Sequence, residues 1–219
     1  MDIEKPYNPL DKVNLGVSVA DAMLIKPAVP LPPPMFRGAG IYAIYYTGSF
    51  PLYKKISALN QKSKFDHPIY IGKAVPPGAR KGGVLGEYKG TALSGRMKEH
   101  ADTIQQVKNL NLNDFFCRYL VVEDIWIPLG ETLLIEKFQP IWNSKLSGYG
   151  NHDPGGGRHG QKKSPWDTIH PGRPWADKLK GVELSADIIE EGTTRFIEDY
   201  VRSISPSLDQ SHPPRLSHS

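Results

Sequence analysis

The sequence contains almost no cysteine: Cys117 is the single thiol among 219 residues. One thiol excludes an intramolecular disulfide framework and a zinc site built from several cysteines, and it fits a reducing compartment. The chain also lacks any run that approaches the ~20 apolar residues of a membrane-spanning helix, so no membrane partner is expected. Residues 1–14 lack the apolar stretch of a signal peptide. These absences predict a cytoplasmic protein.

Signatures of several enzyme classes are missing as well. The sequence contains no P-loop, no paired-histidine zinc helix and no GxSxG nucleophile elbow. Asp66 with Glu87-Tyr88-Lys89 does offer the D…ExK pattern of another large restriction-nuclease fold. That triplet is frequent by chance and lies here in a glycine-rich loop, where that fold requires a strand. The pattern therefore gives little support to that fold.

The net charge is small, +4 with a pI near 9.0, but the charges are unevenly distributed. Residues 73–108 and 145–180 each carry seven Lys or Arg against three acids, whereas residues 181–203 carry two against six. An ordinary solvated surface accounts for any one such run. Two basic segments that are rich in glycine and proline, one of which contains Trp166 and Trp175, indicate a surface for a polyanion. Nucleic acid is the leading candidate, because phosphate neutralisation needs many dispersed cations.

Prolines and glycines, 20 and 21 in number, cluster and divide the chain. Residues 1–37 are punctuated by proline and end in the stiff run Pro30–Pro34, so we interpret them as an N-terminal arm with a short helix at Val17–Ile25. Composition also suggests the other boundaries: a domain at 38–150 with insertions at 48–67 and 75–93, a basic loop and acidic helix at 151–204, and a disordered tail at 205–219.

Hydrophobic periodicity and turn residues predict the elements of the central domain. Ser94 is a plausible N-cap for the helix predicted at Leu93–Val107, and Pro140 should end the helix predicted at Gly130–Gln139. The order strand, strand, helix, strand, helix predicts an α/β (α+β) domain with a small three-stranded mixed or antiparallel sheet flanked by helices. The predicted strands are Gly40–Thr47, Pro68–Ala74 and Phe115–Glu123, and the predicted helices are Leu52–Gln61, Leu93–Val107, Gly130–Gln139 and Ser185–Ile204.

Two tyrosine-bearing triplets lie in the first two predicted strands. Gly40-Ile41-Tyr42 opens the first strand, and Tyr70-Ile71-Gly72 lies in the second, 28 residues later. Alternate side chains of a strand point the same way, so Tyr42 and Tyr70 can lie side by side on adjacent strands. Tyrosine is also a common β-former in protein cores, so neither triplet alone assigns a function.

The helix that follows carries Arg96 and His100 at spacing i, i+4, hence on one face. A solvent-facing polar pair would give the same pattern. The functional interpretation is a phosphate clamp beside a proton acceptor. A guanidinium binds phosphate through two parallel hydrogen bonds, and an imidazole titrates near neutral pH.

A carboxylate, Glu131, lies early in the next apolar helix, and an amide, Asn143, follows it 12 residues later. The helix dipole favours negative charge near a helix N-terminus, so Glu131 also fits as an ordinary first-turn residue. Glu136 is the competing acid of the same helix.

Together, the two triplets, the arginine–histidine helix and the segment ETLLIEKFQPIWN resemble the GIY-YIG nuclease family. The resemblance covers about residues 38–145, and the departures are the 27 residues between the triplets and the basic loop 75–93. Insertions of this kind, with an N-terminal arm and a C-terminal extension, make the chain most similar to the free-standing type II restriction endonuclease branch. Excision-repair and homing nucleases of the family are longer, multi-domain chains.

The resemblance implies hydrolysis of phosphodiester bonds with one Mg²⁺ per active site, held by Glu131. Tyr42 corresponds to the tyrosine that positions or deprotonates the attacking water. A phenol is a poor base at neutral pH, so His100 is the candidate to take that proton. Whether Tyr42 or His100 is the final proton acceptor stays open.

Four further residues receive roles from the resemblance or from their position. Arg96 should hold the scissile phosphate. Tyr70 and Asn143 correspond to groups that position the phosphate or the nucleophile. Lys73, directly after the second triplet, is either an added cation at that site or a surface lysine that ends a strand.

The resemblance also implies partners: double-stranded DNA cut within a short GC-rich palindrome, a second copy of the chain, and a DNA methyltransferase in a bacterial cytoplasm. A palindrome calls for two-fold symmetry and hence a homodimer. Whether the arm or the C-terminal helix forms the dimer interface stays open. The candidate DNA-binding residues are the cations Lys73, Arg80, Lys81, Lys89, Arg158, Lys162, Lys163 and Arg173.

Two alternatives keep the fold but change the function. A structure-selective repair nuclease would share the active site and cut many sequences, and an inactive GIY-YIG module would bind DNA without cutting it. The presence of every residue type expected of a catalyst argues against the inactive module: Tyr42, Tyr70, Arg96, His100 and Glu131.

Overall fold

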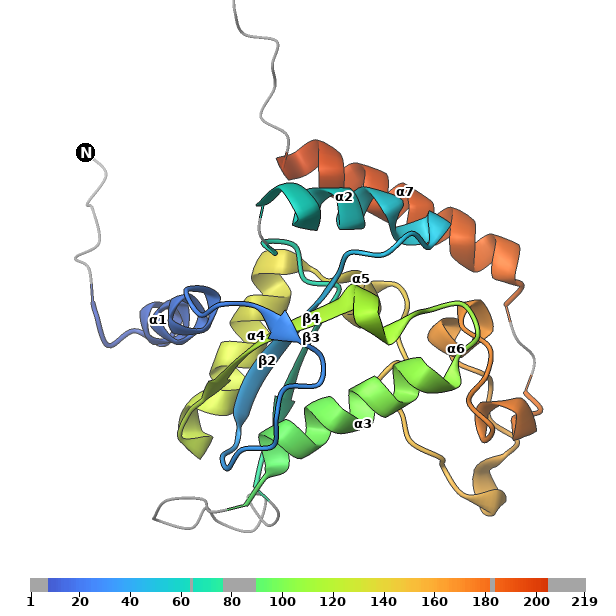
Figure 1. The fold of residues 1–219 in the computed structure, drawn as a ribbon, viewed down its shortest axis with the longest axis horizontal. Coiled ribbons are helices and arrows are strands. Elements are labelled where there is room, and N and C mark those ends of the chain that lie inside the picture. Colours follow the sequence, from blue (N-terminus) through green and yellow to red (C-terminus); the bar gives the residue numbers. More distant parts are fainter. Residues whose placement is uncertain (1–7, 64, 77–89, 182–183, 205–219) are drawn as a thin grey trace, which may run out of the picture.

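The computed structural model describes residues 8–63, 65–76, 90–181 and 184–204, and these residues form a sheet with helices on both faces (Figure 1). The sheet has four strands in the order β1-β4-β2-β3, and every neighbouring pair is antiparallel. The α/β architecture expected from the sequence is confirmed. The strands are β1 Val29–Pro30, β2 Gly40–Tyr46, β3 Tyr70–Ala74 and β4 Phe115–Val121.

β1 is an addition to the three strands that the sequence predicts. It is only two residues long and pairs with the outer edge of β4. Proline lacks a backbone N–H and is tolerated only at such an edge position, which explains why a proline-rich segment conceals a strand. The adjoining Leu31 is 4% exposed, so this part of the N-terminal segment contributes to the core.

Each predicted helix is present in the described residues, with differences at its ends, and two short helices at Ile141–Ser144 and Pro165–Ile169 were not predicted. Short 3-10 turns lie at Pro51–Tyr53, Leu112–Asp114, Asp124–Trp126, Gly156–Arg158 and Ala176–Lys178. The α-helices are α1 Lys12–Leu24, α2 Lys54–Ser63, α3 Ala92–Gln106, α4 Ile127–Phe138, α5 Ile141–Ser144, α6 Pro165–Ile169 and α7 Ala186–Ile204.

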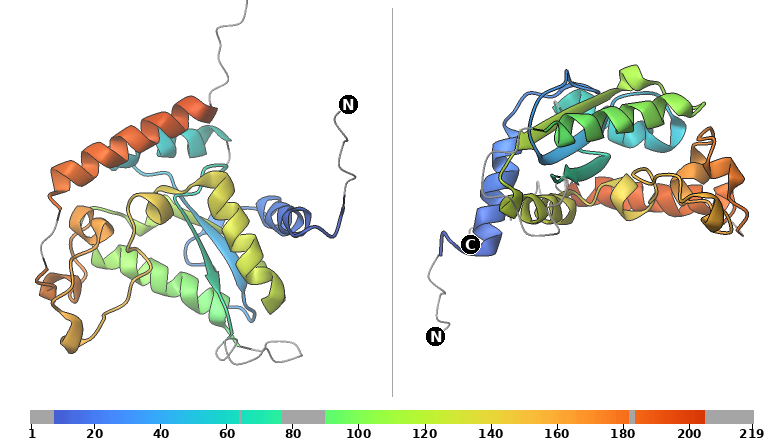
Figure 2. Two further views of the ribbon diagram at one scale, coloured as in Figure 1. Left: turned by 180° about the vertical axis from the view of Figure 1, so that it is seen from behind. Right: turned by 90° about the horizontal axis from the view of Figure 1, so that it is seen from below.

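The central strand β2 is buried along its whole length because each face of the sheet is covered. Tyr42 and Ile44 belong to the core cluster shared with α3, whereas Ile41 and Ala43 belong to the cluster shared with α1 and α4. α3 and α4 therefore lie on opposite faces of the sheet, as the view from below shows (Figure 2). This layering decides which residues can reach the two tyrosines directly.

α4 begins earlier than predicted, and this moves Glu131 away from the first turn. The helix starts at Ile127, with Pro128 in its first turn, where proline needs no partner for the N–H it lacks. The helix ends at Phe138, followed by Gln139 in the left-handed region (φ 41°) and Pro140. Glu131 is thus the fifth helical residue, and its interpretation as a first-turn residue is wrong.

Ser94 is not a helix cap, because α3 starts at Ala92 with Thr91 in the cap position. The Ser94 hydroxyl instead donates to the backbone oxygen of Phe36 at 2.7 Å, and the Phe36 N–H donates back to it at 3.2 Å. The side chain therefore ties the end of the N-terminal segment to α3.

The N-terminal helix α1 packs against α4 and is longer than the helix predicted at Val17–Ile25. Gly16 faces α4 so closely that a Cβ atom there would overlap Leu133. Ala20 and Met23 are buried in the same cluster. Residues 12–24 therefore dock on the domain.

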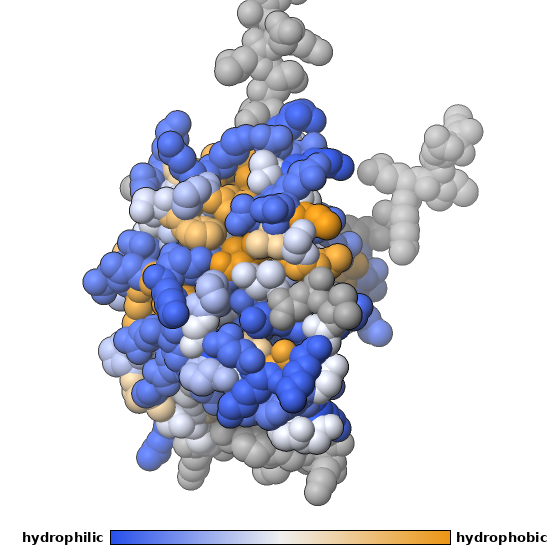
Figure 3. Space-filling model, turned by 90° about the vertical axis from the view of Figure 1, so that its right-hand side faces the viewer, coloured by the Kyte–Doolittle hydropathy of each residue, from blue (hydrophilic) through white to orange (hydrophobic). Residues whose placement is uncertain are grey.

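The segment 151–204 shares the core of the central domain. Trp166 is fully buried, and Ile189 and Ile197 of α7 belong to the same cluster. The prediction that Trp166 contributes to a polyanion-binding surface is wrong, because the core covers its ring. Figure 3 shows the side on which α6 and α7 lie: hydrophilic residues cover most of it, and apolar residues gather near its middle. Within the described ranges, no helix is both long enough and apolar enough to cross a bilayer.

Candidate active site

The two tyrosines lie next to each other, as predicted. β2 and β3 pair so that Tyr42 faces Gly72 and Ile44 faces Tyr70, and the two tyrosine rings are 6.2 Å apart. A Cβ atom at Gly72 would overlap the Tyr42 hydroxyl, so the glycine of the second triplet makes room for the tyrosine of the first. The antiparallel register therefore places the two triplets at one point.

The Tyr42 hydroxyl lies 2.6 Å from His100 Nε2, and both residues are buried. Burial raises the pKa of Tyr42 well above its ordinary value, Tyr70 adds to the rise and Arg96 opposes it. Burial also lowers the pKa of His100 well below its ordinary value, and the electrostatic influence of the neighbouring Arg96, His152 and Arg173 lowers it further. At neutral pH the phenol therefore keeps its proton and donates a hydrogen bond to a neutral imidazole.

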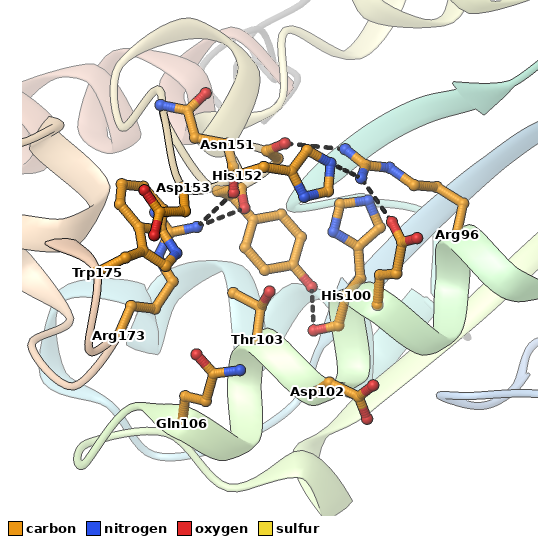
Figure 4. A pocket seen from close by; sticks show the side chains of 13 residues that line it. Arg96, His100, Asp102, Thr103, Gln106, Asn151, His152, Asp153, Arg173 and Trp175 are labelled. Atoms are coloured by element: carbon orange, nitrogen blue, oxygen red, sulfur yellow. Dashed lines mark hydrogen bonds and ion pairs between the residues drawn. The ribbon is translucent and has the colours of Figure 1, made fainter. Parts of the chain in front are cut away.

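Arg96 reaches from α3 to three acceptors at the edge of this cluster (Figure 4). Its Nη1 atom lies 2.8 Å from Glu99 Oε2 and 2.6 Å from His152 Nε2, and its Nη2 donates to the Gly150 carbonyl at 2.9 Å. The guanidinium always carries its protons, so it donates to the imidazole, whose Nε2 must be unprotonated in this contact. Arg96 and His100 thus come from one helix face, as predicted, and both approach the tyrosines.

Tyr149 is a residue of this cluster that the sequence did not reveal. Its ring stacks on His100 with centroids 4.5 Å apart and meets the Tyr70 ring edge-on at 5.0 Å. Its hydroxyl donates to the His100 carbonyl at 3.1 Å. A tyrosine between two glycines in an irregular segment has no periodicity that marks it as buried, and only the long-range fold places it here.

A hollow of about 290 Å³ opens beside Arg96, between α3 and residues 149–153 (Figure 4). His100 and Tyr149 lie at its base, and its walls carry both acidic and basic side chains. Its size suits a small polar group such as a phosphate with water, rather than a large apolar ligand. The remaining side chains that line it include Glu99, Asp102, Thr103, Gln106, Asp153 and Trp175.

Glu131 lies on α4, which covers the face of the sheet opposite to α3. It approaches the site at β3, one of the two edge strands. Its carboxylate forms an ion pair with Lys73 of β3, with Nζ and Oε2 2.6 Å apart. Burial is the main cause of the raised pKa of both Tyr70 and Tyr42, and the negative charge of Glu131 adds to the rise in each. The acid is therefore within electrostatic reach of both tyrosines although its helix covers the other face.

The donor set at Glu131 fits a hard, strongly hydrated divalent ion. In the described parts of the chain, no group of three or more His, Cys, Asp or Glu residues is arranged so that it could hold a metal ion. Mg²⁺ characteristically keeps several waters and binds one or two carboxylates together with substrate phosphates. A single carboxylate with an exposed fraction of 18% suits that mode of binding.

Asn143 contacts backbone rather than the hollow. Its Oδ1 accepts from the Ile71 N–H and its Nδ2 donates to the Ile71 carbonyl, each at 2.8 Å. The side chain thus pairs with the free edge of β3 as a neighbouring strand would. These two bonds hold Asn143 against the strand that carries Tyr70, and its expected role in positioning phosphate or nucleophile stays a prediction.

The candidate DNA-binding cations differ in their surroundings. Arg158 and Lys162 are exposed, and Lys163 is half-buried and 3.5 Å from Asp177. Lys73 is paired with Glu131 as described above. Arg80, Lys81 and Lys89 lie outside the described residues.

Arg173 cannot contact DNA as predicted, because it is 1% exposed. Its Nε donates to Asp167 Oδ1 at 2.6 Å, and the rings of Trp166 and Trp175 lie 4.8 and 4.6 Å from its guanidinium carbon. A basic residue in a glycine-rich basic segment gives no sequence signal for such burial, because its acidic partner is visible only in the fold.

Comparison with known proteins agrees with the motifs. The family model described as the Eco29kI GIY-YIG domain matches residues 34–197, about three quarters of the chain. The match extends through α6 and most of α7, well beyond the motif-bearing residues. No curated protein matches the chain.

Proposed function

Because the chain belongs to the family of the Eco29kI GIY-YIG domain, a family of type II restriction endonucleases, we propose that it cuts double-stranded DNA within a short palindrome. The chain is a restriction-type nuclease with DNA as its substrate. The proposal adds that the site is GC-rich, that Mg²⁺ is required and that the enzyme acts as a homodimer. The observation that supports catalysis most strongly is the buried contact between the Tyr42 hydroxyl and His100 Nε2.

That contact supplies a path for the proton of the attacking water. The water donates to the Tyr42 oxygen while the phenol proton moves to His100 Nε2, so no free tyrosinate has to form. With the pKa of Tyr42 raised by burial, a free tyrosinate is unfavourable, and His100 is therefore the final proton acceptor in this proposal. The oxygen–phosphorus bond to water forms as the bond from phosphorus to the 3′-oxygen breaks.

Arg96 is the group to bind the scissile phosphate. Its guanidinium is held beside the tyrosines by acceptors on two sides, so little reorganisation is needed when an anion arrives. The positive charge of Arg96 is also one cause of the low pKa of His100. A phosphate on Arg96 offsets that charge, which raises the pKa of His100 and makes it a better base when substrate is bound.

Glu131 is the residue to hold Mg²⁺, with water and the phosphate completing its shell. When bound, the ion acts as a Lewis acid that stabilises negative charge on the phosphate and on the leaving 3′-oxygen. Lys73 neutralises Glu131 in the structure. In the substrate complex we expect the Lys73 ammonium to turn from the carboxylate to the DNA backbone.

The DNA surface in this proposal continues from Arg96 over residues 151–163. A second hollow of about 300 Å³ adjoins the first, shares Asn151 and His152 with it, and is lined by Arg158 and Lys162. Cations that follow the hollows would neutralise phosphates next to the scissile one. A palindromic site would be met by two copies of the chain, and a DNA methyltransferase of the same specificity would protect the host genome.

Digestion of an unmethylated plasmid of several kilobases tests the proposal. In Mg²⁺ the purified protein should give a small set of discrete fragments, and in EDTA it should give none. A smear or nicked circles would indicate a repair-type or non-specific nuclease instead. Intact plasmid that nevertheless shifts on a gel would indicate a DNA-binding module without activity.

A further inference from the structure

The segment Gly148–His152 packs against Arg96 and His100. The buried Arg173 contacts the same segment from the side away from these two residues. We propose that Arg173 is a positioning residue of the active site, which acts by fixing this segment against α3. The inference rests on the proposed nuclease function and goes beyond it, because it assigns a role to residues that lie outside the recognised motifs.

Arg173 holds the segment through its planar fork of donors. Nη1 donates to the carbonyls of Tyr149 and Asn151, each at 3.1 Å, and Nη2 donates to the carbonyl of Gly148 at 2.9 Å. Three carbonyls within four residues are thus bound by one guanidinium. A lysine offers a point charge without this fork and could not hold all three in the same geometry.

Arg173 is itself fixed on its other side. Its Nε donates to Asp167, and the second carboxylate oxygen of Asp167 accepts from the Ser164 hydroxyl at 2.6 Å. Gly148 has a φ of +116° and approaches Ser164 so closely that a Cβ atom would overlap it. A buried ion pair of this kind is poor evidence for stability, but it does impose one geometry on the segments that it joins.

The opposite side of the segment contacts the candidate catalytic residues. The Tyr149 ring stacks on His100, and the Tyr149 hydroxyl is bonded to the His100 carbonyl. The Gly150 carbonyl accepts from Arg96, and His152 accepts from the same guanidinium. A shift of the segment would therefore move both the base and the phosphate-binding group.

Gly150 shows how closely the segment approaches the site. A Cβ atom there would lie 3.0 Å from the Tyr70 hydroxyl oxygen and 3.2 Å from Arg96 Nη2, closer than ordinary van der Waals contact. At Gly192, which is exposed on α7, a Cβ atom would meet nothing within 4 Å. The two glycines therefore form a matched pair for substitution, one against the site and one in open space.

The test compares Arg173→Lys, Gly150→Ala and the control Gly192→Ala with the wild-type protein. Two quantities are measured on a plasmid that the wild-type protein cuts into discrete fragments. The first is the single-turnover cleavage rate in Mg²⁺ with enzyme in excess. The second is the DNA affinity in Ca²⁺ at several salt concentrations. We expect about tenfold slower cleavage for Arg173→Lys and Gly150→Ala, with DNA affinity and its salt dependence within twofold of wild type, and no change for Gly192→Ala.

Three results would overturn the inference. One is a folded Arg173→Lys variant that cuts at the wild-type rate. Another is weaker DNA binding with a flatter salt dependence but unchanged cleavage of bound DNA, which would make Arg173 a DNA contact. If Arg173→Lys does not fold, equal rates for Gly150→Ala and Gly192→Ala would overturn it. A wild-type protein that cuts no DNA would instead refute the proposed function, on which the inference rests.

Discussion

At the scale of single residues, the candidate site depends on contacts between side chains from distant parts of the chain. The Tyr42 hydroxyl lies 2.6 Å from His100 Nε2, and the ring centroids of Tyr70 and His100 are 5.2 Å apart. Arg173 pairs with the buried Asp167 and binds the Gly148 carbonyl. The geometry of the site is therefore set by residues both within and outside the motifs.

The buried histidines make the stability of the fold sensitive to acid. Burial, with a smaller contribution from Arg173, lowers the pKa of His170 to about 3, and the His170 ring forms hydrogen bonds with Tyr53 and Asn109. The pKa of His100 is lowered in the same direction. Below pH 6.5 the unfolded chain binds protons at these positions that the folded chain does not, so stability is complete above that pH and declines as the pH falls toward 3.

Urea unfolding at pH 7.5 and pH 5.0 measures this effect. As the pH falls from 6.5 to 5.0, the shifted pKa of each histidine should lower the free energy of unfolding by about 1 kcal/mol per pH unit. Carboxylates contribute in the same sense, so the informative comparison is His170→Gln, whose loss of stability between the two pH values should be smaller than that of the wild-type protein. An identical loss in both proteins would show that folding does not shift the pKa of His170.

The motif side chains could be predicted from the sequence, whereas the residues that contact them could not. Strand alternation and helix spacing are local rules, and they place Tyr42 beside Tyr70 and Arg96 on one helix face with His100. The burial of Arg173 depends on Asp167 and on carbonyls about 25 residues away, which no local rule connects.

At the scale of elements, the sequence predicted which elements exist better than where they begin. α4 starts three residues before its predicted start, because a 3-10 turn and Pro128 initiate it where the periodicity is weak. β1 was missed because proline masks an edge strand. The central strands and α3 were predicted within two residues at each end, since their hydrophobic patterns are continuous.

The close pairing of β2 and β3 should make Gly72 intolerant of any side chain. In Gly72→Ala the new methyl group would displace the Tyr42 hydroxyl from His100, so we expect at least a hundredfold loss of cleavage rate. Gly95→Ala, in helix α3, is the control, because a Cβ atom there would meet nothing within 4 Å. Alanine has a higher helix propensity than glycine, so this variant should be more stable by about 0.5–1 kcal/mol. Single-turnover cleavage and urea unfolding measure the two effects; wild-type cleavage by Gly72→Ala would argue against the Tyr42–His100 pair.

At the scale of the whole molecule, segments that composition set apart from the central domain proved to be packed against it. α1 docks on α4, and α7 lies beside α2, with Lys55 and Glu198 2.8 Å apart (Figure 1). Composition reveals flexible or polar stretches, but it does not reveal whether a polar stretch contains the few buried residues, such as Trp166, that anchor it. Such anchoring is a property of the completed core.

The distribution of charge over the molecule leads to a prediction for DNA binding. Arg158→Ala combined with Lys162→Ala removes two exposed cations beside the hollows, so the slope of log affinity against log salt should fall by about 2. Arg195→Ala on the acidic helix α7 is the control, because its side chain is 72% exposed and pairs with Glu191. An unchanged slope in the double variant would remove this surface from the DNA interface.

The account as a whole depends on Glu131 acting together with the two tyrosines across the edge of β3. Its most direct test is the single-turnover cleavage rate of Glu131→Gln in Mg²⁺, measured on a plasmid that the wild-type protein cuts, with DNA affinity measured in parallel in Ca²⁺. The account predicts that cleavage is lost by at least a hundredfold while the variant still binds DNA specifically, because the amide keeps the shape of the side chain but not its charge. Cleavage within a few-fold of the wild-type rate would contradict it, because the acid proposed to hold the metal would then be dispensable.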